Sequence, residues 1–484
     1  MCRKTRSFGI GIILVLVGTM SSGAALAESP SVLLEKAIYE EETVGNLDAA
    51  AKLYRRTIEE AKQVDAVAAK AQYRLGLCLL KQGKKEEGVA ALQEVVRRFS
   101  EQKEIVAEAR KHLPSEPGLK LLPVPWVDGE TQHQRMELGG GLELGTAIYS
   151  VQKAELDGQK IWRFRSRVFA FGRGSASCVD VRQDNLQPIR SVWNIGGVSS
   201  TIAQYNGNKI TVTTKTAGKE TQRTIDVQPA PYDNEEGAFL FRCLPMTKGH
   251  NTNVPIFASI GNSQAIDIGF QPQGQESVST PAGQFQCEKV LLPTPINQTF
   301  WYSADRRRYF VKFEANNIVG LLTKIETRKP GESQAYENAD LGVSLCLSPD
   351  WHAYASAQTK DNLWLLDPDA VFATGLKSYK LAKLSADEKK SPRAWAEKWL
   401  IDAGKREKQW RVRPKSWRSM TISGEKAVEF AADFTATDGR EMVRFVVCLF
   451  GKTRAVRLAA DGPRGELERM KKAILPMVES LKVK

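Results

Sequence analysis

The chain has 484 residues, a formal net charge of +13 and a charged fraction of 26%. This length is enough for two to four domains that each bury a core of their own. No segment after the N-terminus is apolar over the roughly 20 residues that a membrane-spanning helix needs, which argues against an integral membrane protein. A basic surface suits an anionic envelope polymer, an anionic lipid or an acidic protein. The charge is densest between Leu376 and Arg418, where 14 lysines and arginines accompany 5 acidic residues, although such a run is more often a solvated helix face.

Residues 1–27 have the pattern of a cleavable secretory signal. A basic start is followed by a short apolar run and by the small-residue triplet Ala25-Leu26-Ala27. Cys2 precedes the apolar run, so a lipoprotein anchor is not expected, and a retained membrane anchor is the alternative. We therefore expect an exported protein, either periplasmic or secreted, that does not meet nucleic acid.

Residues 31–113 predict two helical hairpins that share one pattern. Gly45 and Gly83 mark the turns, and Ala50 and Gly88 follow each turn by five residues. A further helix is expected after the second hairpin, because a stack of repeats needs its open end covered.

Together the two hairpins of residues 31–113 resemble a divergent pair of tetratricopeptide repeats. The residues that carry the resemblance are Leu75, Gly76, Leu79, Gly83, Gly88 and Leu92. The resemblance implies a groove that binds another polypeptide, so an unknown protein partner is expected. Two repeats make only a short groove, and the alternative is a helical cap for the rest of the chain.

A proline-rich linker at 114–125 separates the helices from a segment, 126–326, with the alternating pattern of strands. Turn dipeptides at Asp157-Gly158 and Asn206-Gly207, each between two extended runs, predict β-hairpins. Several antiparallel strands of this kind form a half-barrel or a sandwich.

Three phrases in this segment carry a second resemblance. They are VDVRQDNLQPIRS at 179–191, STPAGQFQCEKV at 279–290 and FWYSADRRRYFVKFE at 300–314. Together they resemble a β-domain family of unknown function in exported bacterial proteins, whose fold is similar to the half-barrels of lipoprotein carriers. The resemblance implies a concave face for a lipid or another apolar ligand. Trp301, Tyr302 and Phe310 are the candidates to line that face, although aromatic residues on strands are more often ordinary core.

A second linker at 327–338 precedes the last segment, 339–484. The phrase GVSLCLSPDWHAY is followed by a helix that begins at Ser391 and Pro392, by a strand MVRFVVCLF that is apolar on both faces, and by a C-terminal helix. This order resembles the PsbP-type α/β sandwich, a fold that serves mainly in binding or accessory modules. The fold class expected for the whole chain is therefore multidomain: all-α helical-repeat hairpins, an antiparallel β half-barrel or sandwich, and an α/β (α+β) sandwich with an antiparallel sheet.

Six cysteines remain after the signal segment, and none forms a CxxC pair. Cys78, Cys346 and Cys448 lie in apolar runs and are expected to be buried free thiols. Cys243 and Cys287 form a possible disulfide within the β-domain, because an exported protein meets an oxidising compartment.

No residue pattern predicts a reactive centre. The four histidines, His112, His133, His250 and His352, fall in different settings without metal-ligand spacing, so neither a metal nor a cofactor is expected. No serine lies in a nucleophile-elbow context, and no catalytic residue can be named. The sequence therefore predicts a non-enzymatic binding or scaffold protein of the bacterial envelope. The alternatives are a carrier of a lipid or apolar ligand and an envelope hydrolase with an unrecognised site.

Overall fold

The computed structural model describes residues 28–61, 65–99, 101–113, 119–216, 219–261, 263–294 and 298–484. The expected signal at 1–27 and part of the first linker lie outside these residues. The chain forms two compact units, residues 1–116 and 117–484, which are described separately. Within the described part of the chain, no helix is both long and apolar enough to cross a membrane.

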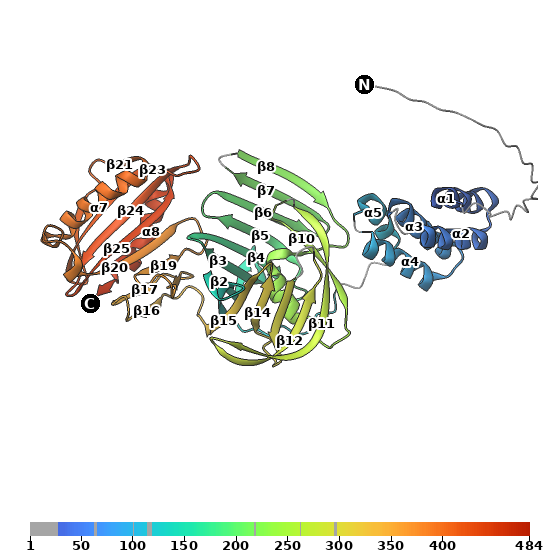
Figure 1. Cartoon of the computed structure of the whole chain (residues 1–484), viewed down its shortest axis with the longest axis horizontal. Helices are drawn as coiled ribbons and strands as arrows, with labels where there is room; N and C mark the ends of the chain where they lie inside the picture. The colour runs from blue at the N-terminus through green and yellow to red at the C-terminus, as the bar shows by residue number, and fades with distance from the viewer. Residues whose placement is uncertain are drawn as a thin grey trace, which may run out of the picture. The chain divides into compact units, whose positions relative to one another are not determined.

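The first unit is a stack of antiparallel helices (Figure 1). Helix α1 begins after Ser29, whose hydroxyl accepts a hydrogen bond from the Val32 N–H, and has proline in its first turn. The helices are α1 Pro30–Tyr39, the π-helical turn η1 Glu40–Val44, α2 Leu47–Glu60, α3 Asp65–Lys81, α4 Lys85–Arg98 and α5 Lys103–His112. The last is the additional helix expected from the sequence.

The predicted glycine positions have two different roles in this stack. Gly45 and Gly83 have φ angles of +74° and +79°, which suit glycine at the tight turns. Gly76 and Gly88 lie where helices α3 and α4 approach closely: a Cβ at Gly76 would lie 2.6 Å from Leu92, and one at Gly88 would lie 2.8 Å from Leu80. Ala50 is fully buried in the hydrophobic core of the stack.

The second unit begins with a curved 15-stranded sheet that wraps around a short helical segment (Figure 1). Its order is β8-β7-β6-β5-β4-β3-β2-β1-β15-β14-β13-β12-β11-β10-β9, so nearly every strand pairs with its neighbours in sequence. Pairing is antiparallel except between β9 and β10. The predicted hairpins form as β2–β3, closed by Leu156 opposite Gln159, and β6–β7, closed by Asn206 opposite Lys209.

The strands of this half-barrel are β1 Glu130–Leu138, β2 Leu142–Leu156, β3 Gln159–Ala170, β4 Arg173–Arg182, β5 Pro188–Ile195, β6 Ser199–Asn206, β7 Lys209–Thr216, β8 Lys219–Asp226, β9 Tyr232–Asp233, β10 Thr252–Ala258, β11 Gln264–Thr280, β12 Gly283–Leu292, β13 Gln298–Ser303, β14 Phe310–Ala315 and β15 Ile318–Thr327. The helical segment consists of η2 Asn234–Glu236, α6 Gly237–Leu240 and η3 Phe241–Cys243. The sheet face that packs against this segment is called the inner face, and the opposite one the outer face.

The C-terminal module, residues 334–484, is an α/β sandwich. An eight-stranded sheet has the order β18-β19-β20-β25-β24-β23-β21, with β22 also paired to β23, and a small sheet has the order β16-β17-β26. Its elements are β16 Gln334–Asn338, β17 Val343–Leu347, β18 His352–Tyr354, β19 Asn362–Leu366, β20 Ala373–Lys380, η4 Leu381–Lys383, η5 Glu388–Lys390, α7 Pro392–Arg406, β21 Lys408–Val412, β22 Arg418–Ile422, β23 Glu425–Thr435, β24 Glu441–Phe450, β25 Arg454–Pro463, η6 Arg464–Glu466, α8 Leu467–Glu479 and β26 Lys482–Val483. Residues 334–338, expected to be linker, thus form strand β16.

Strand β24 is buried on both faces, as its apolar sequence predicts. Val443 and Phe445 pack with helix α8, whereas Val446 and Cys448 pack with helix α7. The Ser391 hydroxyl caps α7 by accepting a hydrogen bond from the Ala394 N–H. The fold class expected from the sequence is therefore confirmed, whereas Cys346 is exposed on β17 instead of being a buried thiol, because it points away from this core.

Candidate functional site

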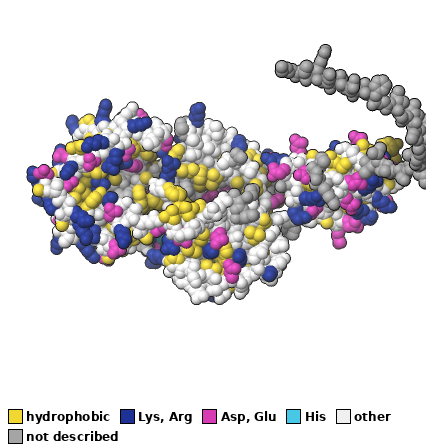
Figure 2. Space-filling view, viewed as in Figure 1, with side chains coloured by type: hydrophobic (Ala, Val, Ile, Leu, Met, Phe, Trp, Pro, Cys, Tyr) yellow, Lys and Arg dark blue, Asp and Glu magenta, His cyan; other side chains and the backbone are white. Residues whose placement is uncertain are grey.

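The inner face of the half-barrel encloses a cavity of about 290 Å³. Strands β2, β3, β10, β11, β13 and β14 and helix α6 contribute to its walls. Aromatic rings dominate the lining: Tyr149, Phe241, Phe300, Phe310 and Phe313. Figure 2 shows hydrophobic side chains over this part of the molecule. A cavity of this size with aromatic walls is typical of a site for a small apolar ligand.

The short helical segment is held in place by buried carboxyl groups. The Asp233 side chain accepts a hydrogen bond from the Glu235 N–H at 2.8 Å, and Glu236 accepts one from the Asp233 N–H at 2.9 Å, which forms a capping box. The Tyr205 hydroxyl also donates to Asp233. These bonds fix the chain where it enters the half-barrel.

Glu235 is the carboxyl group that lines the cavity. Burial raises its pKa above the usual value of 4.5, and the charge of Asp233 raises it further. Burial also raises the pKa of Tyr149, so its hydroxyl stays protonated at neutral pH. The cavity therefore combines apolar walls with one carboxyl and one phenol group.

The three predicted ligand-face residues do not share one role. Phe310 lines the cavity. Tyr302 lies on the same side of the sheet but is fully buried against Phe310, with ring centroids 5.3 Å apart, and does not reach the cavity. Trp301 is wrong as a ligand-face residue, because successive strand residues point to opposite faces. It packs on the outer face with Val311 and Leu322.

Cys243 and Cys287 are both free thiols, so the predicted disulfide is wrong in this structure. Cys243 packs on the inner face with Tyr302 and Phe310. Cys287 packs on the outer face with Trp301. The sheet itself separates the two sulfur atoms, and sequence spacing gave no sign of this.

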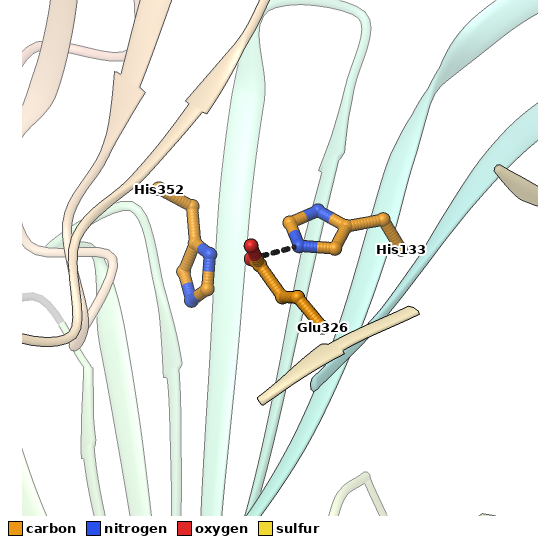
Figure 3. Close-up of side chains that lie close together, drawn as sticks. All are labelled: His133, Glu326 and His352. Carbon is orange, nitrogen blue, oxygen red and sulfur yellow. Dashed lines mark hydrogen bonds and ion pairs between the residues drawn. The ribbon is translucent and has the colours of Figure 1, made fainter. Parts of the chain in front are cut away.

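Two histidines that are far apart in sequence meet at one carboxylate (Figure 3). His133 of β1 bonds the Glu326 carboxylate of β15 through its Nε2 at 2.8 Å, and His352 of β18 presents a ring nitrogen to the same group. Candidate ligand atoms of all three lie within 4.8 Å of one another. Two histidines and one carboxylate are a donor set for a divalent metal. Sequence spacing did not predict this cluster, because its members come from three separate strands.

Positive neighbours oppose a cation at this histidine–carboxylate cluster. Lys324 bonds Glu326 at 2.6 Å and Arg328 bonds it at 2.9 Å, so this single carboxylate already has two cationic partners. Burial lowers the pKa of His352 well below 6.5, and the charges of Arg167 and Arg328 lower it further. A divalent ion would add positive charge at a position where the surrounding residues already disfavour protonation of His352. We therefore describe the cluster as an ion-pair network that joins the half-barrel to the C-terminal module.

The helical unit has its own candidate binding residues. Val32, Tyr39 and Val44 are 42%, 57% and 54% exposed, and all lie on α1 or the π-helical turn after it. The turn is held by Glu41, which is buried and accepts hydrogen bonds from Tyr54 at 2.6 Å and from Lys81 at 2.7 Å. The exposed apolar side chains therefore sit on a fixed backbone.

Comparison with known families supports two of the modules by sequence. A tetratricopeptide repeat model matches residues 70–101, and the model of a protein family of unknown function, DUF3108, matches residues 133–325. These matches confirm the resemblances for the helical hairpins and the β-domain. No curated protein matches the chain.

Solved structures with similar parts have low sequence identity. The PsbP protein of the cyanobacterium Synechocystis is 9% identical, covers 32% of this chain and 95% of its own, with a TM-score of 0.26. A Bacteroides fragilis protein with a YmcC-like fold, described as a candidate exported protein, is 12% identical, covers 43% of this chain and 100% of its own, with a TM-score of 0.22. LpqN of Mycobacterium tuberculosis, involved in cell envelope biogenesis, is 13% identical, covers 32% of this chain and 91% of its own, with a TM-score of 0.23. At these TM-scores no functional argument rests on them.

Proposed function

We propose that this chain is a non-catalytic binding protein of the bacterial envelope whose helical unit binds a polypeptide partner. The observation that carries the proposal is the tetratricopeptide match at 70–101 on interlocked helices α3 and α4. Stacked repeats of this type present a surface on which another chain can lie. The secretory pattern at 1–27 supports an exported location.

The exposed apolar residues of the first helix are the proposed contacts. Tyr39 and Val44 are more than half exposed, next to acidic Glu40, whereas Glu42 is paired with Arg74. An exposed tyrosine with a fixed backbone gives a large contact area at a small entropic cost. The partner segment is expected to combine an apolar side chain with a basic one, which would match this surface.

Selection of peptides from a displayed library on the full chain tests this function. Selected peptides should bind the wild type and lose at least about tenfold in affinity when Tyr39→Ser and Val44→Ser are combined, because interface aromatics commonly dominate binding. Ile401→Ser is the matched control, since Ile401 is 63% exposed on α7 of the other unit. Equal binding by the double variant and the control would refute a role for the helical unit.

A second candidate function is favoured by the half-barrel cavity. Its aromatic walls and volume of about 290 Å³ suit a small apolar molecule or part of an acyl chain. Native mass spectrometry with added medium-chain fatty acid should detect a one-to-one complex. Ala315→Phe, which fills the cavity wall, should abolish that complex, whereas Ala282→Phe in an exposed turn should not. Complex formation that is insensitive to Ala315→Phe would argue against a carrier role.

A further inference from the structure

Arginines gather where the C-terminal module covers the outer face of the half-barrel. Arg163, Arg165 and Arg167 alternate along β3, so their side chains point to one face of the sheet. Arg190 extends from β5, which lies two strands away across β4. Arg469 approaches from α8 of the C-terminal module.

A cavity of about 420 Å³ lies among four of these residues. Its charged lining is Arg163, Arg165, Arg190, Arg469, Asp180 and Asp369. Four arginines face the two aspartates of the lining and Asp350, which lies 3.8 Å from Arg165, so one formal positive charge is left over. Asn194 adds a neutral polar group, and the loop at 368–371 closes one side.

The pairing of these charges is uneven. Arg163 binds both oxygens of Asp180, at 2.6 and 3.0 Å, and is fully matched. Arg165 reaches only Asp350, at 3.8 Å, and its buried Nε has no hydrogen-bond partner among the described residues. The buried Nε of Arg190 likewise has none in that part of the chain. The donor atoms without partners therefore belong to the two arginines in the middle of the cavity wall, Arg165 and Arg190.

Arg167 adds a buried charge beside this cavity. Its side chain is 2% exposed, and neither its Nε nor its Nη2 has a hydrogen-bond partner within the described ranges. It lines an adjoining space of about 40 Å³ that is bounded by Asp367 and Ala370 of the same loop. Burial and the charge of Arg165 lower its pKa to about 10, so it is still a cation at neutral pH. A buried charge of this kind is costly unless a counter-charge lies near it.

We propose that the arginine pocket, formed by Arg163, Arg165, Arg190 and Arg469, binds a phosphate group. Arginine forks match phosphate oxygens with two parallel hydrogen bonds, and the unpartnered Nε atoms of Arg165 and Arg190 and the excess positive charge both favour an anion here. The group can belong to free phosphate or to the headgroup of a lipid, since both present the same oxygens. This site is separate from the helical unit and from the inner cavity, so it stands independently of the proposed function.

Calorimetric titration of the full chain with inorganic phosphate tests this pocket, with sodium chloride added to constant ionic strength. Arg165→Gln and Arg190→Gln should each weaken binding by about tenfold or more, because each removes charge-assisted hydrogen bonds. Arg173→Gln is the matched control: it removes the same charge from an exposed position on β4. Arg190→Lys keeps the positive charge but lacks the two parallel N–H donors of the guanidinium, so it should also weaken binding. This variant replaces Arg190→Gln in the test if Arg190→Gln does not fold.

Co-sedimentation with phosphatidylcholine vesicles, with and without phosphatidic acid, distinguishes the two sources. Binding to the acidic vesicles that is lost in Arg190→Gln supports a headgroup, and phosphate binding without vesicle binding supports the free anion. If neither probe binds, or if both bind equally to Arg165→Gln, Arg190→Gln and Arg173→Gln, the proposal is overturned.

Discussion

Around strand β3, the two faces of the half-barrel sheet hold different kinds of side chain. On strand β3, Trp162 and Phe164 face inward into an aromatic core. Arg163 and Arg165, one position further in each case, face outward toward the C-terminal module. A single strand thus supplies an apolar wall and a cationic wall, because its side chains alternate. A short helical segment covers the inner face, and the folded C-terminal module covers the outer face.

The two faces around β3 are therefore expected to be stabilised by different interactions. The inner face relies on packing, with the rings of Phe164 and Phe239 stacked 4.6 Å apart. Around β3 the outer face carries ion pairs such as Arg163 with Asp180, and beside them the buried Arg167, two of whose nitrogen atoms have no hydrogen-bond partner among the described residues. Packing contributes to stability at any pH, whereas ion pairs make stability depend on pH. The following changes test that contrast, in order of expected size.

Phe164→Ala should have the largest effect, because it removes a fully buried ring from the inner core. We expect a loss of about 3–5 kcal/mol in the free energy of unfolding, measured by urea denaturation with tryptophan fluorescence. Phe171→Ala is the control, since Phe171 is 78% exposed in the next turn. Similar losses from both substitutions would show that the inner face is not a packed core.

Glu326→Gln should have the next largest effect, because it leaves Arg328 and His133 without their ionised partner. We expect a loss of roughly 2–3 kcal/mol at pH 7. Burial alone would raise the pKa of Glu326, but hydrogen bonds from His133 and Lys324 and the charge of Arg328 lower it well below 4.5.

The same glutamate predicts an acid dependence with a definite sign. A carboxyl with a lowered pKa in the folded state contributes stability above its unfolded pKa, and that stability is lost as the pH falls below about 4.5. The acid branch of the unfolding curve should therefore be flatter for Glu326→Gln than for wild type. Glu314→Gln, whose carboxylate pairs with Lys312 at the surface, should keep the wild-type acid branch.

His352→Gln should have a smaller effect that is confined to mildly acidic pH. The folded protein keeps His352 neutral, because burial and nearby positive charges lower its pKa well below 6.5. The unfolded chain takes up a proton below pH 6.5, so wild-type stability should fall as the pH decreases from 7 to 5, by up to about 1.4 kcal/mol per unit. His352→Gln should reduce that slope, whereas the exposed His250→Gln should leave it unchanged. An unchanged slope in His352→Gln would contradict a buried neutral histidine.

The smallest expected change concerns Cys243 and Cys287, which lie on opposite faces of the sheet. Thiol titration of the denatured chain without its first 27 residues should count six thiols. Dithiothreitol should not change the melting temperature, because no bond joins the two faces. A count of four with a reductant-sensitive melting temperature would restore the predicted disulfide.

The local sequence was sufficient to predict the turns and the order of the helices and strands. Gly45 and Gly83 could be predicted as turn residues, because a left-handed backbone conformation depends on the residue itself and its immediate neighbours. Ser391 and Pro392 placed the start of α7, and Asp157-Gly158 and Asn206-Gly207 placed two hairpins. Each of these signals acts within about four residues, so no distant contact is needed to interpret it.

Only the tertiary structure decided which side chains meet. His133, Glu326 and His352 come together through pairing of β1 with β15 and through the docking of β18, over more than 200 residues of chain. Trp301 and Tyr302 were predicted to share a face, although neighbouring strand residues must separate, and the curvature of the sheet decided which one points inward. The arginines of β3 form a pocket only because the loop at 368–371 covers them. Contacts between distant segments depend on how whole elements pack, and that information is spread over the entire chain.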